Sequence, residues 1–122
     1  MHSEHFSEKE LACKHCGENR VTPELLDLAE KVRSILGVPM IVHCAYRCPI
    51  HNAEVGGVSG STHVRGMAMD FHCDDLIMSD AYHTLIDMAK NGKLPELGGI
   101  GLYDWGLHID CYHAADGHLR VW

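Results

Sequence analysis

Long apolar runs and basic side chains are both scarce in this sequence of 122 residues. No segment approaches the roughly 20 apolar residues of a membrane-spanning helix, and the polar start MHSEHFSEKE lacks the apolar core of a secretory signal. Ten basic residues stand against seventeen acidic ones, which gives a net charge of −7. Because nucleic-acid binding depends on basic side chains that neutralise phosphates, we do not expect a nucleic-acid partner.

The length of the chain suits one compact domain over residues 1–122 and is too small for two. The apolar fraction of 46% is ordinary for a globular protein. Because the sequence shows no export signal, we expect the protein to be made in the cytoplasm. We also expect a monomer without a membrane span.

Histidine and cysteine, in contrast, are plentiful. The eleven histidines raise the expectation of a metal site, because imidazole is the commonest metal ligand in proteins. The six cysteines could form disulfides or remain thiols, and their even number does not decide between these states. Cys13, His15 and Cys16 could bind a second, structural zinc ion, but a single CxxC lacks the second pair that a closed site needs.

The spacing of apolar residues predicts an α+β fold. Helical periodicity indicates helices at 6–12, 22–36 and 79–91, with Ser7 and Thr22 as capping residues of the first two. Residues 48–61 are typical of a short helical turn followed by a glycine-rich loop. Alternation and β-formers indicate strands at 40–46, 67–72, 99–103, 107–111 and 118–122. We expect the helices to cover one side of a small, largely antiparallel sheet.

An aspartate in an apolar strand points to a metal. Asp70 lies in the predicted strand 67–72, where a carboxylate is costly unless something neutralises it. Strand alternation places Asp70 on the same face as Ala68, and it places His108 and Asp110 on one face of the strand 107–111. If these strands are neighbours, Asp70 and His108 can converge with His63 from the preceding loop.

Two neutral histidines and one carboxylate form the ligand set of a catalytic zinc site that keeps one position for water. Zinc lowers the pKa of this water towards about 7 and polarises the carbonyl under attack. A carboxylate must then take the proton of the water, and Asp110 is our first candidate for this base, with Asp104 the second. The competing interpretation is that His63 and His108 are hydrogen-bonded core residues and Asp70 is a turn or cap residue.

Several ordered blocks of the sequence resemble a known family. Residues 61–70 match the SxHxxGxAxD signature of the zinc D-Ala-D-Ala carboxypeptidases and endopeptidases, metallopeptidase family fifteen. Residues 45–52, followed by a glycine pair, resemble its GYRxxxHN…GG segment. Residues 98–103, 107–110 and 120–122 are similar to the short-chain branch that ends GGVGxY…VHxD…RxW. Many members carry a glutamate three residues before the last ligand, where this chain has a tryptophan.

The resemblance implies a Hedgehog/D,D-peptidase type of fold. It also implies one catalytic Zn²⁺ bound by His63, Asp70 and His108. The activity that it implies is hydrolysis of peptide bonds in the stem peptides or cross-links of bacterial peptidoglycan, by a D,D-carboxypeptidase or endopeptidase.

Further residues take their expected roles from the same resemblance. Arg47 would act at the substrate carboxylate or the developing oxyanion, as a catalytic and substrate-binding residue. Ser61 and Tyr46 would also bind substrate, and Ser61 could equally support the ligand shell.

The small format, with no wall-binding repeat, predicts an endolysin-like enzyme of a phage or prophage that acts on the cell wall. Two alternatives stay open at this point: a zinc-containing binding module without catalysis, and a phage structural module of the same fold.

Overall fold

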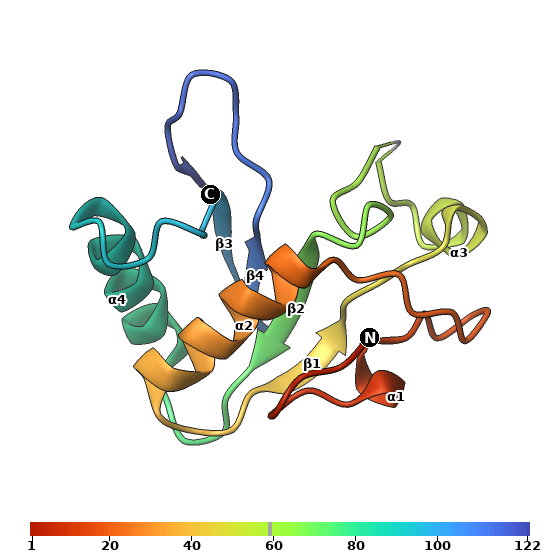
Figure 1. Ribbon diagram of the computed structural model, residues 1–122, viewed down its shortest axis with the longest axis horizontal. Helices are drawn as coiled ribbons and strands as arrows, with labels where there is room; N and C mark the ends of the chain where they lie inside the picture. The colour runs from red at the N-terminus through yellow and green to blue at the C-terminus, as the bar shows by residue number, and fades with distance from the viewer. Residues whose placement is uncertain (59) are drawn as a thin grey trace.

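A five-stranded sheet organises the computed structural model, which describes residues 1–58 and 60–122 (Figure 1). Its strands are β1 (Ile41–Cys44), β2 (Ala68–His72), β3 (Gly99–Tyr103), β4 (Gly106–Asp110) and β5 (Arg120–Val121). They lie in the order β1-β2-β4-β3-β5, and every neighbouring pair is antiparallel except β3 and β5. The predicted α+β class and largely antiparallel sheet are therefore confirmed, while the predicted end strand 118–122 shortens to β5.

Local sequence signals explain where the helices begin and end. The helices are α1 (Glu8–Leu11), α2 (Pro23–Leu36), α3 (Pro49–Glu54) and α4 (Met78–Lys90). The Thr22 side chain caps α2 by accepting a hydrogen bond from the backbone N–H of Leu25, and Gly37 ends this helix with a positive φ of 71°. Within the described part of the chain, no helix is long and apolar enough to cross a membrane.

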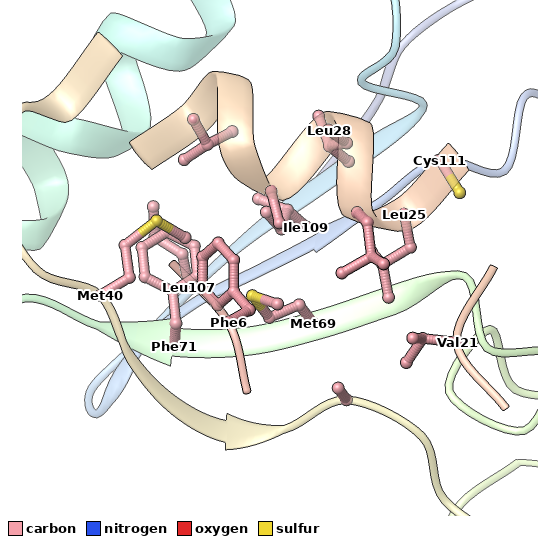
Figure 2. Close-up of a cluster of buried hydrophobic side chains, with 14 of the residues drawn as sticks. Phe6, Val21, Leu25, Leu28, Met40, Met69, Phe71, Leu107, Ile109 and Cys111 are labelled. Carbon is pink, nitrogen blue, oxygen red and sulfur yellow. The ribbon is translucent and has the colours of Figure 1, made fainter. Parts of the chain in front are cut away.

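The hydrophobic core lies on one face of the sheet, beneath α2 (Figure 2). Met69 and Phe71 of β2 and Leu107 of β4 point towards this helix and are fully buried. Leu28 of α2 and Leu85 of α4 belong to the same buried cluster. Because side chains alternate along a strand, the residues between these core positions face the other side of the sheet.

That second face carries the polar residues singled out in the sequence. The register places Asp70 of β2 opposite His108 of β4, and Ala68 opposite Asp110. On the other side of β4, Gly101 of β3 pairs with His108. A Cβ atom on Gly101 would lie 2.3 Å from Nε1 of Trp122, so glycine leaves room for this indole to lie across the sheet. The sheet therefore separates an apolar core from a polar, open face.

Candidate metal centre

The three predicted ligands meet on the open face of the sheet. Nε2 of His63 lies 3.1 Å from Oδ2 of Asp70, and Nδ1 of His108 lies 2.9 Å from Oδ1 of the same carboxylate. One donor atom from each residue falls within 4.8 Å of the other two. His63 and His108 are buried, and Asp70 is half-buried. The structure thus brings together two imidazoles and a carboxylate from a loop and two adjacent strands.

Gly66 explains how the loop presents His63. Its φ is +70°, and a Cβ atom here would lie 2.0 Å from the carbonyl oxygen of Arg20. The Gly66 carbonyl accepts a hydrogen bond from the backbone N–H of Thr22 at 2.9 Å. Only glycine permits both the left-handed conformation and this close approach of two backbones. The motif glycine therefore docks the ligand-bearing loop against the segment before α2.

Hydrogen bonds outside the ligand set orient both imidazoles. Nδ1 of His63 lies 2.8 Å from the carbonyl oxygen of Ala45, which leaves Nε2 facing Asp70. Nε2 of His108 lies 2.8 Å from Oδ2 of Asp110, which leaves Nδ1 facing Asp70. An imidazole held by an oxygen at one nitrogen and open at the other is the usual arrangement of a metal-binding histidine. The donor set and its orientation therefore fit a zinc ion.

The electrostatics of the centre favour bound positive charge. Burial raises the pKa of Asp70, but hydrogen bonds from His108 and His63, together with their charges, lower it to about 2. Burial lowers the pKa of His63, but its hydrogen bonds to Asp70 and Cys44 and the nearby carboxylate raise it to about 10. The pKa of His108 is also raised, because its contacts with Asp110 and Asp70 outweigh burial. A divalent cation would supply the charge that protons otherwise provide here.

Asp110 lies behind His108 and is fully buried. Its Oδ1 accepts hydrogen bonds from the Arg120 guanidinium and, at 3.1 Å, from the backbone N–H of Tyr112, while Oδ2 contacts His108. Of the carboxylates that the structure describes, only Asp70 and Asp110 line the adjoining cavity. Asp104 is exposed in the turn between β3 and β4 and does not line the cavity, although its neighbours Tyr103 and Trp105 do. The general-base role of Asp110 stays a prediction, and its contacts give it a second role in holding His108.

A cavity of about 510 Å³ opens in front of the centre, a size typical of sites for small ligands. Arg47 and Ser61 both line it, as predicted for substrate-binding residues. Nη2 of Arg47 donates to Oγ of Ser61 at 3.3 Å, and this Oγ also accepts the backbone N–H of His63 at 3.2 Å. Nε of Arg47 is buried and has no hydrogen-bond partner among the described residues. The Arg47 guanidinium therefore retains donor capacity for a ligand.

Tyr46 lies elsewhere. Its side chain is 5% exposed, belongs to the hydrophobic core and does not line the cavity. Its backbone N–H donates to the carbonyl oxygen of Leu11 at 3.1 Å, which ties this segment to the end of α1. The structure therefore does not bring Tyr46 to the site with Arg47, and the burial of its side chain leaves it no direct route to a substrate in this cavity.

An aromatic wall borders the cavity. Tyr103 and Trp105 stack at 5.0 Å between ring centroids, and Nε1 of Trp122 donates to the Tyr103 hydroxyl at 2.5 Å. The Trp122 ring lies 5.2 Å from that of His108. In the sequence, Arg120 and Trp122 stood out only as part of the C-terminal Arg-x-Trp block. A short motif does not show that these side chains lie against Asp110 and His108 of β4.

Comparison with known proteins adds one finding. A family model described as Peptidase M15 matches residues 4–110, a range that includes the three candidate ligands and Asp110. No curated protein gives a significant match.

Proposed function

This chain belongs to the peptidase M15 family, and on that basis we propose that it is a zinc-dependent metallopeptidase that hydrolyses peptide bonds in the stem peptides or cross-links of bacterial peptidoglycan. The observation that carries the proposal is the convergence of His63, Asp70 and His108 at the base of an open cavity. A bound zinc ion supplies Lewis acidity at the carbonyl of the scissile bond.

The residues around the ligands prepare the site for this chemistry. The Ala45 carbonyl and Asp110 hold the two imidazoles so that His63 presents Nε2 and His108 presents Nδ1. Arg120 neutralises the buried Asp110 carboxylate and so stabilises this arrangement. Because these contacts exist before substrate binds, little rearrangement is needed to form the active geometry.

Arg47 supports the choice of substrate class. A guanidinium binds a carboxylate through two parallel hydrogen bonds, and peptidoglycan stem peptides carry free carboxylates. The contact with Ser61 holds the Arg47 guanidinium near His63, and its unpaired Nε leaves a donor available. The wall of Tyr103 and Trp105 offers apolar surface to small side chains such as alanine. We extend the proposal to an endolysin-like role at the cell wall.

Defined muropeptides test the proposal. We expect the zinc-loaded protein to shorten them, as detected by mass spectrometry, and a chelator to stop the reaction. His63→Ala should abolish hydrolysis and lose the zinc ion of this centre, because one of three ligands is removed. His83→Ala, at an exposed histidine of α4, serves as the matched control and should remain active.

Two results would contradict the proposal. Full hydrolysis by a metal-free His63→Ala variant would show that the centre is not needed. A zinc-loaded protein that binds muropeptides but cleaves none of them would favour the binding-module alternative.

A further inference from the structure

Three thiols gather on the side of the molecule where the N-terminal segment meets α3. Cys13 and Cys16 flank a tight turn, and Cys48 is the N-cap residue of α3. One Sγ atom from each lies within 4.8 Å of the other two, and all six cysteines of the chain are free thiols. This thiol cluster shares no residue with the cavity in front of His63, Asp70 and His108.

We infer that the thiol cluster of Cys13, Cys16 and Cys48 binds a second zinc ion, with a structural role and His15 as the fourth ligand. Structural zinc sites use four protein ligands in a tetrahedron, and three thiolates with one imidazole are a frequent set. Nδ1 of His15 lies 3.6 Å from Sγ of Cys48, while the donor atoms that all lie within 4.8 Å of one another are those of the three thiols alone. With zinc–sulfur and zinc–nitrogen bonds of about 2.3 Å and 2.0–2.1 Å, a tetrahedral edge has about this length.

Backbone amides donate hydrogen bonds to two of the three sulfurs in the cluster. The N–H of Cys48 donates to Sγ of Cys13 at 3.3 Å, and the N–H of His51 donates to Sγ of Cys48 at 3.4 Å. Burial raises the pKa of Cys13, but backbone hydrogen bonds from Cys48, Cys16 and His15 bring it to about 7. The backbone hydrogen bond at Glu18 lowers the pKa of Cys16, but burial and the contacts with Cys13 and Cys48 outweigh it, so this pKa is raised. Thiolates are the form of cysteine that binds metals, so this environment suits a zinc site.

The fold brings a third cysteine to the CxxC pair, which the spacing of cysteines in the sequence did not show. A CxxC pair alone does not close a zinc site, and Cys48 reaches Cys13 and Cys16 only because the turn that they flank docks at the start of α3. The ion would join these two segments next to Arg47, the residue before Cys48. We therefore assign the second zinc the task of fixing the loop that delivers Arg47 to the cavity.

A disulfide is the competing use of these thiols. It would join two sulfurs at about 2.05 Å and leave the third thiol unpaired. A zinc site uses all three, together with the imidazole, and so accounts for the whole cluster.

Counting zinc by native mass spectrometry under reducing conditions tests the inference. We expect two ions in the wild-type chain, one in His63→Ala and one in Cys48→Ser. Serine preserves the N-cap hydrogen bond of α3, so Cys48→Ser should still fold. Cys16→Ser, at an exposed position, gives a second variant with the same expectation. Cys73→Ala removes a buried thiol outside the cluster and should keep both ions.

Cobalt substitution provides a readout that is independent of activity. Thiolate ligands give Co²⁺ a charge-transfer absorption in the near ultraviolet, which a centre of imidazoles and a carboxylate does not produce. This band should appear in the wild type and in His63→Ala, and it should be lost in Cys48→Ser. His15→Ala should weaken cobalt binding to the cluster.

The inference would be overturned by a single zinc ion in the wild type that disappears in His63→Ala, or by a disulfide within the cluster in place of the second ion. Neither result contradicts the proposed peptidase activity, whose metal ion would be held by the other centre. Conversely, a protein with two zinc ions and no hydrolysis would reject the activity and retain the second site.

Discussion

Among single residues, Asp110 is the one whose contacts reach furthest beyond the ligand set. Its carboxylate links His108 to Arg120 and to the backbone of Tyr112 while lying fully out of solvent. A buried carboxylate that orients a metal-binding imidazole contributes to metal affinity, and one that accepts a proton contributes to turnover. These two roles can be separated by measurement.

Asp110→Asn should weaken zinc binding at the catalytic centre by about 10- to 100-fold, because the amide loses the charge that holds His108 and Arg120. Competition with a chromogenic chelator measures the affinity, in a Cys48→Ser background that isolates this centre. Asp104→Asn, at an exposed turn residue, is the control and should leave the affinity unchanged. Unaltered zinc affinity together with lost turnover in Asp110→Asn would instead assign the residue to general-base catalysis alone.

Gly66 gives a second prediction at this scale. Gly66→Ala should lower the free energy of unfolding by about 2 kcal/mol or more, because strain at a positive φ is combined with a clash against the Arg20 carbonyl. Gly117 has a similar φ of +75°, but a Cβ atom there would lie within 4 Å of no other atom of the described residues. Gly117→Ala should therefore lower the free energy of unfolding by only about 1 kcal/mol. Urea denaturation measures both variants. Equal losses would show that the close approach of the two backbones contributes nothing.

At the scale of elements, Glu30 of α2 holds the N-terminal segment. Its carboxylate accepts hydrogen bonds from the Ser3 hydroxyl at 2.6 Å and from the backbone N–H of His5 at 2.8 Å, and it pairs with the His5 ring at 2.6 Å. Phe6, which follows His5 in the chain, is buried in the core beneath α2 (Figure 2). Burial raises the pKa of Glu30, but the contacts with Ser3 and His5 outweigh it and leave the pKa below 4.5.

Because the pKa of Glu30 is lower in the folded protein than its ordinary value of 4.5, the ionised carboxylate stabilises the fold at pH values above 4.5. This stabilisation is lost as the pH falls through the pKa of the folded state. Glu30→Gln should therefore destabilise the protein at pH 7 and have a smaller effect near pH 3. Unfolding free energies of both proteins at several pH values test this expectation. Asp27→Asn, an exposed carboxyl of the same helix, controls for surface charge. A difference that does not change with pH would contradict the role of Glu30.

For the whole molecule, the sheet keeps metal chemistry and core packing on opposite faces. The apolar side chains of β2 and β4 pack beneath α2, while Asp70 and His108 lie on the open side. The core is complete without the catalytic ion, so loss of that ion alone should weaken the fold and not abolish it.

In a Cys48→Ser background, free zinc at 100 times its dissociation constant should raise the unfolding free energy by about 2.7 kcal/mol. Thermal or urea unfolding over a series of zinc concentrations measures this increase. Adding His63→Ala should remove the dependence on zinc, because the centre loses a ligand. Complete unfolding of the metal-free protein would show that the core is insufficient by itself.

Much of the fold and the centre followed from local patterns. The capping residues Ser7 and Thr22 predicted where helices begin, and both caps are present. Alternation along β2 and β4 predicted that Asp70 and His108 share the face opposite the core, and the register confirms that they are neighbours. These predictions succeed because each depends on residues only a few positions apart.

The sequence by itself determined the approximate secondary structure, the faces of β2 and β4 and the identity of the three candidate ligands, because helix and strand periodicity are properties of short segments. Only the tertiary structure decided that Tyr46 is buried, that Arg120 pairs with Asp110, and that Cys48 meets the turn flanked by Cys13 and Cys16. Such contacts join segments that are distant along the chain, and they form where the core packing places those segments in space.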